Sequence, residues 1–260
     1  MLANALILGD DASPMDIAAY LARLAYTGPT GPSPATLAAL HLAHLFAVPF
    51  ENLDIGRRPI VLEEAAFFEK IVQRRRGGFC YELNGLFAAL LRELGFRVTL
   101  VSGRVATAAG GFGAEFDHLA LVVELDERWL LDVGFGDSFL EPLRLDSRDA
   151  TVQGKREYRI DEVDGELVLL RRETEWKTQY RFSVEARALA DFSGMCVYHQ
   201  TSPESGFTRR STCSIATESG RVTLSGDRLI VTRDSVRDER PVAEAEKAAL
   251  LREHFGVVLE

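Results

Sequence analysis

The spacing of apolar residues changes at Gly95, and this change constrains the fold more than any other feature of the 260-residue chain. Before Gly95 the apolar residues recur every three or four positions, as on the buried face of a helix, most clearly at Leu83, Leu86, Phe87, Leu90, Leu91 and Leu94. After Gly95, short runs rich in β-branched and aromatic residues predict strands, beginning with Arg97–Val105, Phe116–Leu125 and Arg128–Val133. Helices followed by strands predict an α+β fold, not the alternating order of a nucleotide-binding sheet.

Charge and cysteine content exclude several classes of protein. The chain has 30 Lys and Arg against 39 Asp and Glu, a net charge of −9, which argues against nucleic acid or a membrane surface as a partner. No run of about 18 apolar residues predicts a spanning helix. Residues 1–14 lack the basic flank of a signal peptide, so we expect a loosely held extension, ordered structure from Met15 onward, and a cytoplasmic protein. Three cysteines are too few for a disulfide scaffold, so a special cysteine is expected to be reactive.

Cys80 lies at the predicted start of the most amphipathic helix, directly after Gly77 and Gly78. A thiol in this position is close to free backbone N–H groups and to the positive end of the helix dipole, and both favour the thiolate. Many free cysteines are simply small buried residues, and the position of Cys80 alone does not decide between the two interpretations.

A nucleophilic thiol needs a base, and the base needs an orienting partner. His118 is predicted to open a strand just after a glycine-rich loop, where functional side chains often project from a rigid frame. Asp132 is the one acid in the apolar segment WLLDVGFG, and a buried carboxylate requires a partner. An imidazole is the better candidate, and the backbone N–H groups of Gly134 and Phe135 are the alternative.

The predicted hairpin between His118 and Asp132 sets a condition on this pairing. The sum of their sequence numbers is even, so they share one face only if the connection has an odd length or contains a bulge. We therefore predict a three- or five-residue connection within Leu125–Arg128. A two-residue turn without a bulge would place the two side chains on opposite faces.

The other histidines have less specific surroundings. His41 and His44 lie three residues apart on a leucine-rich helix, where a satisfied structural role is expected. His254 is expected on a solvated helix face. His199 is predicted to lie in a loop that could line a site.

A zinc site is the rival use of these residue types. Cys196, His199 and Cys213 would supply three ligands, and no fourth is evident. Structural zinc requires four ligands, so no metal is expected, and Cys196 and Cys213 are predicted to be packing residues.

Five segments together resemble the arylamine N-acetyltransferase family. They are RRGGFCYELNGLF (Arg75–Phe87), PFENLDI (Pro49–Ile55), the strand-opening His118, LDVGFG (Leu131–Gly136) and TSPESGF (Thr201–Phe207). The resemblance extends over nearly the whole chain from Met15. It implies an N-terminal helical bundle over 1–95, a central antiparallel β-barrel over 96–190, and a linker with an α/β lid over 191–260, around a papain-like cysteine catalytic core.

The resemblance also implies a catalytic triad of Cys80, His118 and Asp132. Acetyl-coenzyme A would be the acyl donor, and an arylamine, arylhydroxylamine or hydrazine the acceptor. Phe50 and Phe135 match aromatic residues near the family's acceptor pocket, and the resemblance implies the same substrate-binding region for Gly136. The implied reaction is ping-pong, with an acetyl-cysteine intermediate.

Coenzyme A is polyanionic, so an acidic chain must present local positive charge to it. Arg74–Arg76 and the pair Arg209 and Arg210 are basic clusters; a solvated face is expected for most of them, with Arg209 and Arg210 as candidate coenzyme contacts. The segment from Met195 to Arg210 departs from better-known family members, which leaves coenzyme contacts and acyl-chain preference open.

Other functions share the same triad. One alternative is an amide synthase that closes a polyketide onto its own aryl amine, and another is a cysteine peptidase or transglutaminase-like enzyme. A binding module without catalysis is the alternative from a different class, and a homodimer is possible.

Overall fold

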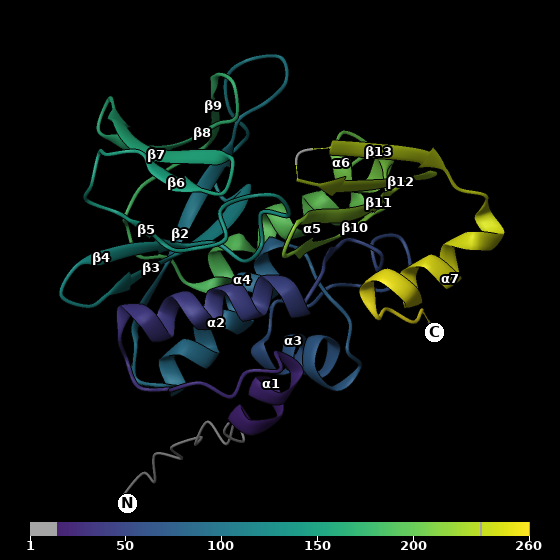
Figure 1. Ribbon diagram of the computed structural model, residues 1–260, viewed down its shortest axis with the longest axis horizontal. Helices are drawn as coiled ribbons and strands as arrows, with labels where there is room; N and C mark the ends of the chain where they lie inside the picture. Colours follow the sequence, from purple (N-terminus) through teal and green to yellow (C-terminus); the bar gives the residue numbers. More distant parts are fainter. Residues whose placement is uncertain (1–14, 235, 260) are drawn as a thin grey trace, which may run out of the picture.

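Helices form the first part of the chain, as Figure 1 shows. The computed structural model describes residues 15–234 and 236–259, so the expected extension over 1–14 lies outside the described residues. The helices are α1 (Ile17–Arg23), α2 (Pro34–Ala47), α3 (Glu64–Phe68), the π-helical segment η1 (Glu69–Gln73) and α4 (Cys80–Glu93). A short strand, β1 (Phe50–Glu51), lies between α2 and α3.

Local sequence explains where the long helices begin and end. Ser33 accepts a hydrogen bond from the backbone N–H of Thr36 at 3.1 Å, which caps the start of α2. Gly95 has a φ of +88°, a left-handed conformation that favours glycine at the end of α4. α3 passes directly into the π-helical segment η1, and the helical hydrogen bonds end at Gln73.

In the described part of the chain, eight antiparallel strands form a nearly closed, barrel-like sheet in the order β5-β4-β3-β2-β9-β8-β7-β6. The strands are β2 (Arg97–Val105), β3 (His118–Glu124), β4 (Arg128–Leu131), β5 (Leu143–Arg144), β6 (Thr151–Gln153), β7 (Arg156–Val163), β8 (Glu166–Arg172) and β9 (Trp176–Phe182). In β3, Leu119 and Leu121 join the core around α4, whereas Ala120 and Val122 join the core inside the sheet. This strand is therefore buried on both faces, and it links the core around α4 to the core inside the sheet.

The register of the β3–β4 hairpin confirms the predicted odd connection. Glu124 pairs with Arg128, so three residues connect the strands. Because directly paired residues have sequence numbers with an even sum, His118 and Asp132 lie on the same face.

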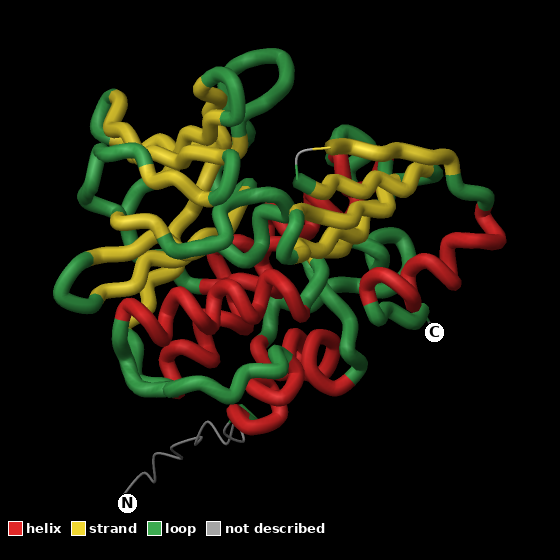
Figure 2. The backbone as a smooth tube through the Cα atoms, in the orientation of Figure 1, coloured by secondary structure: helices red, strands yellow, loops and turns green. Residues whose placement is uncertain are grey.

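The last part of the chain forms a second sheet with a helix against it. The order is η2 (Leu189–Phe192), α5 (Ser193–Thr201), α6 (Gly206–Arg209), β10 (Thr212–Thr217), β11 (Gly220–Ser225), β12 (Arg228–Arg233), β13 (Val236–Pro241) and α7 (Glu244–Phe255). β1 pairs with β10, so the helical part supplies an edge strand to this sheet. Figure 2 shows the two sheets above the helices of the first part, with α7 below the right-hand end of the smaller sheet.

These features confirm the predicted α+β architecture of helices, barrel-like sheet and lid. In the lid, β10 to β13 form an antiparallel meander of four strands. The prediction that His199 lies in a loop is wrong, because this residue lies within α5. Within residues 15–234 and 236–259, no helix combines the length and apolar character needed to cross a membrane.

Candidate active site

Cys80 is the first residue of α4, as the sequence predicts, and only 3% of it is exposed. The two glycines before it allow neighbouring segments to approach closely. A Cβ on Gly77 would lie 1.9 Å from the carbonyl oxygen of Pro49, and a Cβ on Gly78 would lie 2.8 Å from a carboxylate oxygen of Glu82. The segment before Cys80 therefore packs tightly between β1 and the first turn of α4.

His118 and Asp132 form a buried pair beside this cysteine. The Nε2 atom of His118 lies 2.7 Å from Oδ2 of Asp132, and the two residues are 2% and 1% exposed. Cys80 is close enough to His118 to raise the pKa of the imidazole. The fold thus brings together the three residues that the sequence predicts as a triad.

Charge and burial act against each other in this pair. Burial alone would lower the pKa of His118, but the charge and hydrogen bond of Asp132, with a smaller effect of Cys80, raise it to about 10. Burial alone would raise the pKa of Asp132, but the charge of His118 and hydrogen bonds from Asn84 and Gly134 hold it below its usual value. The site therefore favours an imidazolium paired with a carboxylate.

Asn84 is a site residue that sequence reasoning missed. Its Nδ2 atom donates to Oδ1 of Asp132 at 2.9 Å and to the carbonyl oxygen of Leu119 at 2.7 Å. Its Oδ1 atom accepts from the backbone N–H of Val133 at 2.9 Å. Asn84 is fully buried and lies one helical turn after Cys80, so the spacing Cys-x-x-x-Asn on one helix face was the available signal.

Two further residues fix the backbone around Asp132. The backbone N–H of Asp132 donates to Nε2 of His41 at 3.2 Å, and the Nδ1 atom of His41 lies 2.8 Å from the carbonyl oxygen of Leu140. His41 is thus a satisfied structural histidine, as predicted. The backbone N–H of Gly134 donates to Oδ1 of Asp132 at 3.0 Å, so the alternative partner of this carboxylate is present together with the imidazole.

Aromatic side chains surround the imidazole. The ring centroids of Phe135 and Tyr180 lie 5.3 Å and 5.1 Å from that of His118. Phe50 lies close to Gly136, where an added Cβ would be 3.4 Å from the ring, and it also packs against Phe207 with the ring centroids 6.1 Å apart. The fold therefore places Phe50, Phe135 and Gly136 in one aromatic region beside the buried pair.

Arg209 and Arg210 line a pocket of about 440 Å³ between the lid sheet, α7 and the segment after β1. Arg57 and Lys247, which the sequence did not single out, line the same pocket. Lys247 pairs with Glu244, but no carboxylate of the described residues pairs with Arg57, Arg209 or Arg210.

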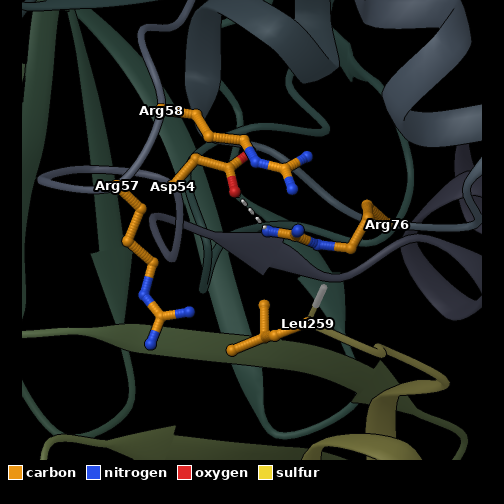
Figure 3. A pocket seen from close by; sticks show the side chains of 5 residues that line it. All are labelled: Asp54, Arg57, Arg58, Arg76 and Leu259. Atoms are coloured by element: carbon orange, nitrogen blue, oxygen red, sulfur yellow. Dashed lines mark hydrogen bonds and ion pairs between the residues drawn. The ribbon is translucent and has the colours of Figure 1, made fainter.

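A second pocket, of about 310 Å³, shares Arg57 and Leu259 with the first. In Figure 3 the guanidinium of Arg57 lies apart from the ion pair of Asp54 and Arg76. Cys80 lines neither pocket. Phe207 lines the larger pocket and also packs against Phe79, the residue before Cys80, with the ring centroids 5.9 Å apart.

The residues of the rival zinc set have separate surroundings. Cys196 packs in the core around α4, and Cys213 packs between the lid sheet and α7. His199 is buried, with its Nε2 atom 3.2 Å from a carboxylate oxygen of Asp117. The described residues contain no group of three His, Cys, Asp or Glu side chains that could hold a metal ion. His44 differs from its predicted role, because neither of its ring nitrogens has a hydrogen-bond partner among the described residues.

Comparisons with known proteins agree with this geometry. A family described as N-acetyltransferase matches residues 34–260. The arylamine N-acetyltransferase of Mycolicibacterium smegmatis is 35% identical over 255 residues, covering 94% of this chain and 93% of that protein. The structure of the Mycobacterium abscessus arylamine N-acetyltransferase has a TM-score of 0.88 at 30% identity, covering 95% and 91% of the two chains. The Mycobacterium marinum arylamine N-acetyltransferase in complex with CoA has a TM-score of 0.87 at 33% identity, with 93% of each chain covered.

These relatives match almost the whole chain, and the region matched by the family, residues 34–260, contains both α4 and the β3–β4 hairpin. The resemblance that the motifs suggested is therefore confirmed. The chain belongs to the arylamine N-acetyltransferase family and is an acyltransferase.

Proposed function

We propose that this protein transfers an acetyl group from acetyl-coenzyme A to an arylamine, arylhydroxylamine or hydrazine through a covalent intermediate on Cys80. The observation that carries the proposal is the buried arrangement of Cys80, His118 and Asp132 in a chain of this family. The three cysteines are free, which supports a reducing compartment, the cytoplasm, as the place of action.

The first half-reaction exchanges one thioester for another. Cys80 gives its proton to His118, and Asp132 stabilises the imidazolium that forms. The thiolate attacks the thioester carbonyl of the donor, and N–H groups in the first turn of α4 stabilise the oxyanion. The carbon–sulfur bond to coenzyme A then breaks, its sulfur takes the proton from His118, and acetyl-Cys80 remains.

The second half-reaction releases the enzyme. The amine attacks the carbonyl of acetyl-Cys80 while His118 removes a proton from its nitrogen. The bond between the acetyl carbon and the cysteine sulfur breaks, and the amide product leaves. Because Cys80 is only 3% exposed, water has little access to the intermediate, which favours transfer to an amine over hydrolysis.

The acceptor is proposed to bind in the aromatic region beside His118. Phe50 and Phe135 supply flat apolar surfaces against which an aromatic ring can stack. Gly136 has a φ of +89° and leaves the face of Phe50 uncovered, because a side chain there would contact the ring.

The phosphates of coenzyme A are proposed to bind in the pocket that Arg209 and Arg210 line. Arg57 and Lys247 add positive charge to the same pocket, and a guanidinium without a carboxylate partner is well suited to bind a phosphate. The CoA complex of the Mycobacterium marinum relative supports coenzyme A as the donor type.

Binding of the phosphates in this pocket predicts that removing its positive charges changes the KM only for donors that contain phosphates. Arg57→Ala combined with Arg210→Ala should raise the KM for acetyl-coenzyme A about tenfold or more, since each charged hydrogen bond contributes on the order of 1.5–3 kcal/mol. The KM for acetyl-N-acetylcysteamine, a thioester without phosphates, should stay unchanged, as should both values in the exposed control Arg233→Ala. An unchanged KM for acetyl-coenzyme A in the double variant would exclude this pocket.

The function itself is tested by a coenzyme-release assay with several acyl donors and aromatic amines. Wild-type protein is expected to release coenzyme A in proportion to N-acetylated product. The rate should fall by at least about a thousandfold in Cys80→Ser, because the weaker nucleophile needs a stronger base than His118. Amine-dependent turnover that persists in Cys80→Ser would contradict the proposal.

A further inference from the structure

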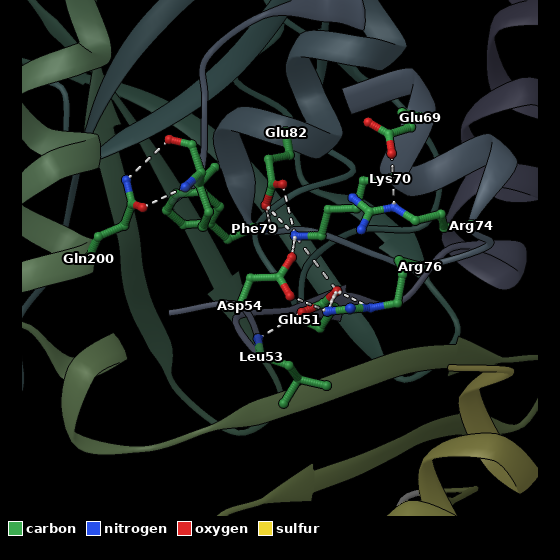
Figure 4. Close-up of polar contacts among 11 residues, drawn as sticks. Glu51, Leu53, Asp54, Glu69, Lys70, Arg74, Arg76, Phe79, Glu82 and Gln200 are labelled. Atoms are coloured by element: carbon green, nitrogen blue, oxygen red, sulfur yellow. Dashed lines mark hydrogen bonds and ion pairs between the residues drawn. The ribbon is translucent and has the colours of Figure 1, made fainter. Parts of the chain in front are cut away.

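Five charged side chains form a buried charge cluster under the start of α4 (Figure 4). They are Glu51, Asp54, Lys70, Arg76 and Glu82, and none is more than 6% exposed. They come from three separate segments. Glu51 and Asp54 lie in β1 and the turn after it, Lys70 lies in η1, and Arg76 and Glu82 lie on either side of Cys80, before α4 and in its first turn. With three acids and two bases, the cluster has one negative charge in excess when all five groups are ionised. Burial raises the pKa of Glu82, and the charge of Lys70 opposes this shift.

Lys70 has contacts with all three acids of the cluster. Its Nζ atom lies 2.8 Å from Oε1 of Glu82, 3.0 Å from Oδ2 of Asp54 and 3.7 Å from Oε1 of Glu51. Arg76 pairs with Glu51 and Asp54 but not with Glu82. Among the described residues, Lys70 is therefore the one cation paired with Glu82.

Glu82 also caps the helix of the nucleophile. Its Oε2 atom accepts a hydrogen bond from the backbone N–H of Phe79 at 3.1 Å, which is the helix-side half of a capping box. The cap stabilises the turn that contains Cys80, but its negative charge lies two residues from the thiol. A nearby negative charge opposes formation of a thiolate and offsets the favourable end of the helix dipole.

We propose that Lys70 is a positioning residue, which cancels the charge of Glu82 so that Glu82 caps α4 without disfavouring the thiolate of Cys80. This inference rests on the proposed role of Cys80 as nucleophile. Burial alone would lower the pKa of Lys70, but the charges of Glu82, Glu51 and Asp54 outweigh it and raise this pKa, so Lys70 remains a cation.

Other titratable groups also face Cys80. His118 and Asp132 approach it from the barrel, Cys196 from α5, and Tyr81 is its neighbour on α4. Burial, with a smaller effect of Glu82, raises the pKa of Cys196 to about 12, and burial also raises the pKa of Tyr81. Both groups are thus neutral near pH 7. His118 and Asp132 are unchanged in every variant below, so differences between the variants report the pair of Lys70 and Glu82.

The test measures how fast iodoacetamide alkylates Cys80 from about pH 4 to pH 9, with the modified peptide identified by mass. Lys70→Met should move the midpoint of the pH profile up by on the order of one unit, because it leaves the charge of Glu82 uncompensated. Glu82→Gln keeps an acceptor for Phe79 but removes the charge, so the midpoint should move down. The double variant restores the net charge of the cluster and should return the midpoint to within about 0.3 unit of wild type.

Controls separate this effect from a loss of structure. Lys177→Met removes an exposed lysine on β9 and should leave the profile unchanged. Circular dichroism monitors folding, and Glu82→Gln reports the charge effect even where Lys70→Met does not fold. An unchanged midpoint in Glu82→Gln, or a double variant that stays displaced, would overturn the inference. A wild-type midpoint equal to that of free cysteine would instead refute the role of Cys80 itself.

Discussion

Gly134→Ala is expected to disrupt catalysis through one steric contact. A Cβ on Gly134 would lie 2.7 Å from the Cα atom of Cys80 and 2.7 Å from Nδ2 of Asn84. Carbon atoms in contact normally stay about 3.5–4.0 Å apart, so the two backbones must separate by about 1 Å. Because Cys80 is held by α4 and cannot rotate away as a flexible side chain could, the separation changes its position relative to His118.

The expected size of the effect follows from that displacement. A misplacement of about 1 Å costs on the order of a hundredfold in rate, and forcing one extra methyl group into a packed site costs about 1–3 kcal/mol of stability. The rate of Cys80 acetylation should therefore fall about a hundredfold in Gly134→Ala, while the free energy of unfolding falls by less than 3 kcal/mol.

Single-turnover acetylation, followed by quenching and intact mass, measures this rate, and urea unfolding measures the stability. Gly194→Ala is the matched control, since no atom lies within 4 Å of its added Cβ and its φ is not in the left-handed region. Acetylation of Gly134→Ala within about threefold of the control would refute the argument that this contact positions Cys80.

Two further predictions test how Asn84 and His118 contribute to the stability of the folded protein. Asn84→Ala should lower the free energy of unfolding by about 2–4 kcal/mol, since it leaves buried partners of Asn84 unpaired at about 1–3 kcal/mol each; a loss below about 1 kcal/mol in urea unfolding would contradict this. The second prediction concerns the pH dependence of the free energy of unfolding. It compares two proteins that both carry Cys80→Ala, one with His118 and one with His118→Gln. In this background the charge and hydrogen bond of Asp132 still raise the pKa of His118, so the folded protein keeps a proton that the unfolded chain releases near pH 6.5. The stability contributed by His118 is thus fully present below about pH 6.5 and is lost at up to about 1.4 kcal/mol per pH unit as the pH rises through the raised pKa. Unfolding at about pH 6, 7.5 and 9 checks this, and a difference between the two proteins that does not change with pH would contradict it.

The pair of His118 and Asp132 could be predicted because it depends on local pattern. A strand-opening histidine, one acid in an apolar run and an odd connection between them already place both side chains on one face of a hairpin. Asn84 could not be identified in the same way, because its partners Leu119 and Asp132 lie 35 and 48 residues away in the sequence. Only the packing of α4 against β3 brings these groups together.

The burial of charged residues was harder to predict from the sequence. Arg76 belongs to a basic run for which a solvated face is the usual expectation, yet it is 4% exposed and pairs with Glu51 and Asp54. Its burial depends on two acids from a segment more than twenty residues earlier, and no periodicity in the sequence indicates this.

The lid contains a strand that the sequence pattern does not predict. β13, with the sequence VRDERP over Val236–Pro241, is exposed along its whole length, so it lacks the alternation of apolar and polar residues that predicts a strand. It becomes a strand because β12 offers an unpaired edge. Edge pairing of this kind is a property of the assembled sheet, whereas the β2 boundaries, Arg97–Val105, follow from local sequence and were predicted correctly.

The most direct test of the account is the intact mass of the protein after exposure to acetyl-coenzyme A without an amine. We predict one acetyl group, located on the peptide that contains Cys80, which disappears when an arylamine is added and reappears as N-acetylated product. Cys80→Ala should acquire no such group. An acetyl adduct that persists unchanged in Cys80→Ala, or wild-type protein that acetylates the amine without ever forming the adduct, would contradict the account.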